Sequence, residues 1–288
     1  MPKNNHNPTP KKSTVKSKVQ AFAKSSEKLK SPSVKKSGIQ RDDLAQHLAN
    51  YLQIAKIKDY CPNGLQVQGR DRIQKIVSGV TASQALIEAA IQAKADAILV
   101  HHGWFWKSDD PSIVGQLHAR LKLLMDHNIN LFAYHLPLDI HPIVGNNAQL
   151  AKVMSWKGQA ALLPGMMDGL MWQANIQPMS LQQLTKSLAS RLGRDPLVIG
   201  EPKQSIKKVA WCTGGAQGYI KEALSLGVDA YISGEVSEQT YHFAKEMGIA
   251  YISAGHHATE RYGVQALGQY INKTFKIEHQ FVDIPNPV

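Results

Sequence analysis

Two adjacent histidines, His101 and His102, follow the apolar run 98–100 and precede Gly103. Neighbouring side chains in a regular strand point to opposite faces, so both rings reach one target only if the strand ends there and the chain turns. Glycine permits such a turn. Ligands of open α/β sheets gather at the carboxyl ends of strands. The pair therefore indicates a metal site, and the alternative is a solvated or packed pair of structural histidines.

Two further pairs with a spacing of four residues add carboxylates to these imidazoles. They are His135 with Asp139, and His256 with Glu260. Imidazole and carboxylate without thiolate suit a borderline divalent ion such as Zn, Mn, Fe, Co or Ni. The number of ligands exceeds what one catalytic ion takes from protein and fits two ions that share a carboxylate. No separate general base stands out, and His135 is the candidate catalytic proton shuttle.

Weaker signals lie close to these residues. His141 and His257 are near enough in sequence to support the ligands, as outer partners of a metal site do. The turn at 213–218 follows a predicted strand and either binds an anion or forms a tight turn only. The aromatic run 104–106 either stacks on a planar base or lines a cleft or an oligomer contact.

Alternating strand and helix signals surround all these motifs. The periodicity predicts strands at 76–80, 97–100 and 129–134, and helices at 41–52, 83–94, 113–128 and 146–156. Such alternation is typical of an α/β fold with mostly parallel sheets covered by helices. A linking segment at 162–202 contains a predicted helix at 181–191.

A repeat organises the chain. Residues 75–80 and 95–102 resemble 208–213 and 228–235 at a constant offset of 133, and 128–132 resembles 248–252. We expect two related α/β halves from an internal duplication, 38–163 and 164–288, with the C-terminal segment able to pack back on the first half. Each half then supplies one of the four-residue pairs, and a glycine, Gly145 or Gly263, is expected to open the next helix.

The charge is concentrated at the N-terminus. Residues 1–37 hold ten lysines and one glutamate, a net charge of +9, whereas the remaining 251 residues carry 23 − 21 = +2. This composition predicts a disordered basic tail, which either touches nucleic acid or is a dispensable extension. The chain shows no long apolar run or secretory leader, and its two cysteines lack paired spacing, so we expect a cytoplasmic protein with free thiols.

The motifs resemble a known family, the dinuclear metal-centre proteins called GTP cyclohydrolase I type 2 homologues or NIF-three-like proteins. The matching segments are Asn63-Gly64-Leu65-Gln66-Val67, His101-His102-Gly103-Trp104-Phe105-Trp106, His135-Leu136-Pro137-Leu138-Asp139, Ser233-Gly234-Glu235 and Gly255-His256-His257-Ala258-Thr259-Glu260. The resemblance covers about 39–288, and the tail lies outside it.

This resemblance implies two related α/β halves and a toroid of six identical subunits with two divalent ions per subunit. It implies a family ligand set in which Glu260 bridges the ions and His135 lies nearby without binding them: His101, His102, Asp139, His256 and Glu260. The family name implies opening of the GTP imidazole ring.

Two functions follow from these expectations. The first is a metal-dependent hydrolase of a nucleotide-like, cyclic amide or phosphoester substrate. The alternative is a non-enzymatic metal-binding ring or scaffold that binds nucleic acid, through the lysine-rich tail, or a protein partner.

Overall fold

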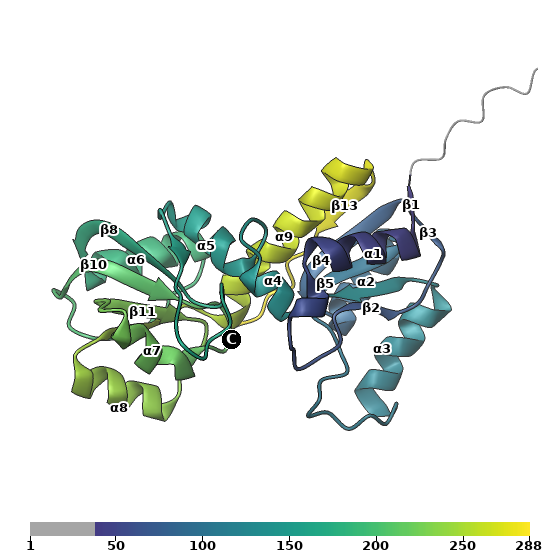
Figure 1. Cartoon of the computed structure of the whole chain (residues 1–288). Helices are drawn as coiled ribbons and strands as arrows, with labels where there is room; N and C mark the ends of the chain where they lie inside the picture. The colour runs from purple at the N-terminus through teal and green to yellow at the C-terminus, as the bar shows by residue number, and fades with distance from the viewer. Residues whose placement is uncertain (1–37) are drawn as a thin grey trace, which may run out of the picture. The chain divides into compact units, whose positions relative to one another are not determined.

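The computed structural model describes residues 38–288, and the predicted basic tail lies outside them. Contacts join the described residues 38–288 into one compact unit (Figure 1). Within the described residues, no helix is both long and apolar enough to cross a membrane. The segments that build the unit are strands and helices in alternation, as the sequence predicts, and they form two large sheets and one small one.

The first large sheet has the order β13-β4-β5-β6-β2. Strands β13, β4, β5 and β6 are parallel, and β2 is antiparallel to β6. The elements of this part are β1 (Ile39–Gln40), α1 (Arg41–Tyr51), η1 (Ile54–Lys56), β2 (Gly64–Val67), β3 (Arg72–Ile73), β4 (Lys75–Thr81), α2 (Gln84–Gln92), β5 (Ala97–His102), α3 (Gly115–Asp126), β6 (Asn130–Ala133), α4 (Leu136–Ile140) and β13 (Glu278–Phe281). Strands β1 and β3 pair separately as a small antiparallel ribbon.

The second large sheet has the order β7-β8-β10-β11-β12-β9. Its elements, with the helices around them, are α5 (Asn146–Met154), β7 (Gln159–Ala160), β8 (Trp172–Ser180), α6 (Leu181–Leu192), β9 (Leu197–Ile199), β10 (Ser205–Trp211), η2 (Gln217–Tyr219), α7 (Ile220–Ser225), β11 (Ala230–Ser233), α8 (Glu238–Met247), β12 (Ala250–Ser253) and α9 (His256–Phe275). Only β10, β11 and β12 are parallel. The antiparallel strands β7, β8 and β9 extend this sheet, and the sequence pattern does not predict them.

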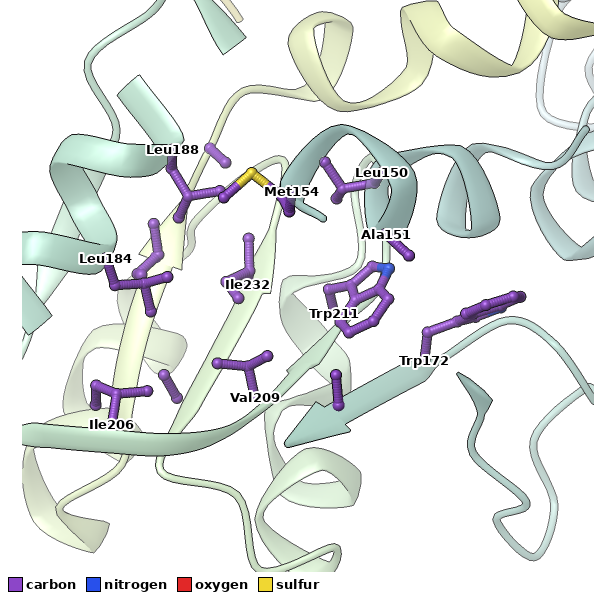
Figure 2. Packing of buried hydrophobic residues seen from close by; sticks show 14 of the residues in the cluster. Leu150, Ala151, Met154, Trp172, Leu184, Leu188, Ile206, Val209, Trp211 and Ile232 are labelled. Carbon is purple, nitrogen blue, oxygen red and sulfur yellow. The ribbon is translucent and has the colours of Figure 1, made fainter. Parts of the chain in front are cut away.

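The central strands of each sheet are buried on both faces, because their apolar side chains alternate between two helical layers. In the first sheet, Ile76 and Leu99 pack with α1 and α9, whereas Val77 and Ile98 pack with α2 and α3. In the second sheet, the layer of α5 and α6 covers Trp211 and its neighbours, which Figure 2 shows in close contact. Helices α7 and α8 cover the opposite face. Each large sheet is therefore the middle of a three-layer α/β/α arrangement.

The two sheets share their strand register. Ile76 pairs with Ala97 in the first sheet and Val209 pairs with Ala230 in the second, and both partners differ by 133 (209 − 76 and 230 − 97). The pairing therefore repeats at the offset seen in the sequence. Descent of the two sheets from one duplicated unit stays a prediction.

The C-terminal elements connect the two sheets. Helix α9 packs against α5 and also against β4 and β5, and Figure 1 shows it running beside α5. The chain then adds β13 to the edge of the first sheet beside β4. At the predicted boundary between halves, α5 and β7 precede residue 164 yet belong to the core or sheet of the second half. The sheets thus exchange segments across the predicted boundary.

Candidate metal centre

The two histidines at the end of β5 reach one carboxylate. His101 Nε2 lies 3.5 Å from Glu260 Oε1, and His102 Nε2 lies 3.1 Å from Glu260 Oε2. Strand β5 ends at His102, two residues beyond the predicted strand at 97–100, so both histidines are its last residues. Gly103 has a further reason to be glycine, because an added Cβ would lie 2.2 Å from the side-chain oxygen of Gln66. The role of Gly103 is therefore close packing as well as the end of the strand.

Helix α9 supplies the other side of the cluster. His256 is its first residue and Glu260 follows one turn later, so their side chains share a face of the helix. His256 Nε2 lies 3.0 Å from Glu260 Oε2. Gly263 lies inside α9, so the expectation that it opens a helix is wrong. Gly145 does precede α5 as its N-terminal cap.

Asp139 is held in the buried cluster by side chains from other elements. Its Oδ1 lies 3.5 Å from His101 Nε2 and accepts hydrogen bonds from Asn146 Nδ2 at 2.8 Å and Thr213 Oγ1 at 3.4 Å. The Asn146 side-chain oxygen in turn accepts the backbone N–H of Gly263 at 2.9 Å. One asparagine therefore fixes the carboxylate of α4 relative to helix α9.

The imidazole tautomers are set by partners on the far side of each ring. His101 Nδ1–H donates to the Tyr134 carbonyl at 2.9 Å, and His256 Nδ1–H donates to Glu235 Oε1 at 2.6 Å. Each Nε2 then presents a lone pair toward a carboxylate, unless it is protonated. Metal-binding histidines are held in this way, with one nitrogen on a carbonyl or carboxylate and the other free for the ion.

Glu260 is the more deeply buried of the two acids in the cluster. Its side chain is 3% exposed, and its Oε2 accepts no hydrogen bond of good geometry within residues 38–288 although two imidazole nitrogens lie close. A buried carboxylate oxygen without a donor is costly. A cation between this oxygen and the imidazole lone pairs would remove that cost. The donor set therefore fits a metal ion.

The electrostatics show how strongly this cluster attracts cations. Burial opposes the charge of His101, but the carboxylates of Asp139 and Glu260 outweigh it and raise the pKa of His101 to about 10. The pKa of His256 is also raised against its burial, to about 9, by Glu260 and Glu235. Burial dominates at His102 and lowers its pKa to about 4. Without a metal, protons on two of the three imidazoles balance the carboxylates, and divalent ions would replace them.

His135 lies beside the cluster and contacts a different acid. Its Nδ1–H donates to Asp59 Oδ1 at 2.8 Å, and its ring centroid is 5.1 Å from that of His101. Burial works against the charge of Asp59, yet hydrogen bonds from His135 and Asn63 lower its pKa to about 2. The Trp106 ring meets His135 edge to face at 4.8 Å. His135 is thus fixed on the border of the cluster, and its role as a proton shuttle stays a prediction.

The other candidates have structural partners. His257 Nε2 pairs with Asp283, and His141 Nδ1 accepts backbone N–H groups of Ile143 and Val144. The Trp104 indole donates to the Ala82 carbonyl. These contacts keep the three side chains out of the cluster itself. The run 104–106 lines the cleft, which is one of the two roles expected for it.

In the turn at 213–218, a Cβ on Gly214 would lie 2.0 Å from Glu260 Oε1. The turn thus passes directly beside the carboxylate that the histidines share. Gly214 allows this close approach because it has no side chain.

Three residues that hold the histidines and Asp139 in place are not predicted from the sequence as site residues. Glu235, Asp59 and Asn146 hold His256, His135 and Asp139 respectively. Glu235 lies in the Ser233-Gly234-Glu235 motif, which is a signal that could have found it. Asp59 and Asn146 lie outside the motifs, and only the folded arrangement brings them to the cluster.

A cleft of about 1180 Å³ opens onto this cluster. Part of its wall consists of side chains from the cluster and its border: His102, His135, Asp139, His256 and Glu260. His101, wholly buried, lies behind them. A small molecule in the cleft can therefore contact the cluster directly.

The family model of Duf34/NIF3 (NGG1p interacting factor 3) matches residues 39–287. The chain belongs to this family. A curated relative from Pseudomonas aeruginosa, named GTP cyclohydrolase 1 type 2 homolog, is 54% identical over 245 residues, which are 85% of this chain and 97% of the relative. The family expectation from the motifs is thereby confirmed.

Solved structures of relatives support the fold. The protein ybgI, titled as of unknown function, is 46% identical with a TM-score of 0.82 and covers 87% of this chain and 100% of its own. TTHA1606 from Thermus thermophilus is 32% identical with a TM-score of 0.77 and the same coverage. The α/β fold predicted from the sequence is therefore shown, together with clusters that could bind metal.

Proposed function

We propose that this member of the Duf34/NIF3 family is a metal-dependent hydrolase with two divalent ions. One ion would be held by His101, Asp139 and Oε1 of Glu260. The second would be held by His102, His256 and Oε2 of Glu260. In each group the candidate donor atoms all lie within 4.8 Å of one another. A carboxylate shared between two ions is the usual bridge in such centres.

The observation that carries the proposal is the position of Glu260. Its two oxygens face three Nε2 atoms, and the opposite nitrogens of His101 and His256 are already committed to Tyr134 and Glu235. A purely structural ion pair would leave one oxygen without a good donor. Two cations would satisfy both oxygens and all three lone pairs.

Bound ions would supply Lewis acidity and would make a water molecule more acidic at neutral pH. The chain contributes the rest. Asn146 and Thr213 keep Asp139 in place, and Glu235 orients His256. Asp59 holds Nδ1 of His135, so Nε2 is the atom left to accept or release a proton at the cleft. No thiolate belongs to the two proposed groups, which favours Zn, Mn, Fe, Co or Ni over soft ions.

Metal analysis of the purified full chain tests the centre. After loading with zinc or manganese and gel filtration, we expect about two ions per chain. Glu260→Gln keeps the shape but removes the shared charge, and it should retain fewer than one. Glu246→Gln, on the exposed side of α8, is the matched control and should retain both. Equal metal content in wild type and Glu260→Gln would contradict the proposal.

A substrate screen tests the hydrolase. Metal-loaded protein is incubated with nucleotides including GTP, phosphoesters and cyclic amides, and products are followed by mass spectrometry. An activity of this centre should be lost in His102→Ala and kept in His118→Ala, which changes a histidine of α3 outside the cluster. An activity that survives in His102→Ala would belong to another site or to a contaminant.

A further inference from the structure

Beyond the metal cluster, the wall of the cleft is rich in aromatic and polar side chains. The additional lining includes Tyr60, Phe105, Trp106, Gln116, Arg120 and Tyr219. Tyr60 is 62% exposed although it is large and apolar over most of its surface. Trp106 lines the cleft beside His135, with its ring centroid 4.8 Å from that of His135 and 6.1 Å from that of His102. Flat aromatic walls beside a reactive centre suit a planar ring.

Arg120 is unusual among the arginines of the described chain. Its Nε is buried yet has no hydrogen-bond partner, and no ion pair with a carboxylate of residues 38–288 involves it. By contrast, Arg41 pairs with Asp71, and Arg70 pairs with Asp96. Arg120 is half-buried, and this partial loss of water lowers the pKa of its guanidinium, with no carboxylate to compensate.

The acids on the same wall do not neutralise this charge. Asp109 and Asp110 line the cleft, but neither forms an ion pair with Arg120 within residues 38–288. Asp110 instead accepts the backbone N–H of Ser112 at 2.9 Å. A guanidinium in this state presents a planar set of donors that matches the oxygens of a phosphate or carboxylate.

We propose that Arg120 binds the oxyanion of an aromatic substrate, with the ring against Trp106 and Tyr60 and the reacting group at the metal cluster. The oxyanion is a phosphate or a carboxylate. The cleft is large enough for a molecule of nucleotide size, since sites for small ligands span about 300–1000 Å³. The substrate class rests on the proposed hydrolase function, whereas the oxyanion site itself is testable without metal.

Calorimetric titration of the full chain tests this site. The probes are adenosine, adenosine 5′-monophosphate and adenosine-5′-carboxylic acid, which share a ring system and differ in the acid group. We expect the two acids to bind metal-free wild type at least about tenfold more tightly than adenosine. The tighter of the two acids identifies the preferred oxyanion.

Variants on one helix then assign the contact. Arg120→Gln should weaken binding of the acids by about tenfold or more and leave adenosine unchanged. Arg120→Lys keeps the charge without the planar fork and should fall between the two. Lys122→Gln, which removes an equal charge from an exposed position that pairs with Asp126, should bind like wild type. Thermal melting of each variant checks that the fold is intact.

The outcomes separate the two proposals. Acids that bind no better than adenosine, or as well to Arg120→Gln as to wild type, would overturn the oxyanion site. Dependence on Arg120 in a chain that retains no metal would support the oxyanion site and reject the hydrolase. Metal-dependent hydrolysis with the same KM in Arg120→Gln would leave the hydrolase standing and reject Arg120 as the anchor.

Discussion

The last two residues of β5 and the two residues that follow β11 correspond at an offset of 133 and carry different chemistry. At the offset of 133, His101 corresponds to Gly234 and His102 corresponds to Glu235. The first strand thus offers two imidazoles directly to the cluster. The segment after β11 instead offers the carboxylate of Glu235, which lies 2.6 Å from Nδ1 of His256, on the side of the ring away from Glu260. One backbone framework therefore provides candidate ligands on one side and an orienting group on the other.

The neighbouring strands β6 and β12 also correspond to each other, and the residues that follow them also differ. β6 pairs with β5 as β12 pairs with β11, with an offset of 120 (250 − 130), and α4 and α9 begin at Leu136 and His256, which differ by the same 120. His135 therefore corresponds to Gly255 and not to His256. The two four-residue pairs are one residue out of phase, so their similar spacing reflects two different local geometries.

The largest expected effect comes from Gly214, which corresponds to Thr81 in the first sheet. Gly214→Ala adds a Cβ 2.0 Å from Glu260 Oε1 at a backbone φ of +73°. Strain and overpacking together cost roughly 2–6 kcal/mol. We expect metal binding to fall below detection in calorimetric titration. Gly218→Ala, where an added Cβ meets no atom within 4 Å, should bind metal normally. Normal binding by Gly214→Ala would refute this account of the turn.

The pH dependence of metal affinity tests the different pKa values of the three imidazoles. The pKa of His101 is raised to about 10 and that of His256 to about 9, so both are protonated at pH 7 without metal, whereas His102, with a pKa of about 4, is neutral. Metal must displace protons from the first two, so affinity should rise from pH 6 to 9 and level off above their pKa values. Calorimetry in buffers of different ionisation enthalpy should count about two protons released. Release of none would contradict the assignment.

Substitution of Glu235, which orients His256, should lower metal affinity less than Gly214→Ala does. Glu235→Gln preserves an acceptor for His256 Nδ1–H but removes the charge, and partners of this kind are worth about 10–100-fold in metal affinity. Competition with a chromophoric chelator measures the change. Glu238→Gln, in the exposed first turn of α8, is the control. If Glu235→Gln lost all metal, Glu235 would be a ligand and the contrast between the two strand ends would disappear.

The smallest effect on metal binding is expected from Asp59→Asn, because Asp59 contacts none of the proposed metal ligands and reaches the border of the cluster only through His135. Asp59 accepts four hydrogen bonds, from Tyr60, Asn63, His135 and Leu136, so its loss should destabilise the fold by about 2–3 kcal/mol. Its pKa falls from 3.8 to about 2 on folding, so this stabilisation is present above pH 4 and disappears as the pH falls toward 2.

Urea unfolding of Asp59→Asn should therefore differ from wild type at pH 7 and converge with it near pH 2. Asp126→Asn, in an exposed pair with Lys122, should change stability little at either pH. A constant difference between Asp59→Asn and wild type across this range would show that the carboxylate charge is not what stabilises the loop.

The strand–helix alternation and the strand-end histidines are predictable because they depend on local patterns. The apolar run before His101 and the spacing from His256 to Glu260 carry their geometry in the sequence itself. The antiparallel β8 is not predictable in this way, because its burial pattern is irregular and its outer residues are polar. The hexameric toroid and the nucleic-acid contact of residues 1–37 stay predictions.

Side-chain contacts between residues far apart in the sequence are the part of the site that the sequence does not predict. The Asn146 side chain contacts Asp139 and also Gly263, which is 117 residues away in the sequence. Asp59 contacts His135, which is 76 residues away. The periodicity of apolar residues along the sequence does not predict contacts between residues so far apart. A spacing of four residues also looks the same whether it starts before a helix, as at His135, or at its first residue, as at His256.

Strand β13 has a consequence for how the chain is made. It pairs with β4, although roughly 200 residues separate them in the sequence, and it forms the outer edge of the first sheet. During synthesis, β4 leaves the ribosome long before β13 has been made. The first sheet therefore keeps an unpaired edge at β4 while the second sheet is translated. Open edges of this kind invite mispairing. Because α9 immediately precedes β13, the last step of folding would both close that edge and deliver Glu260 to the histidines.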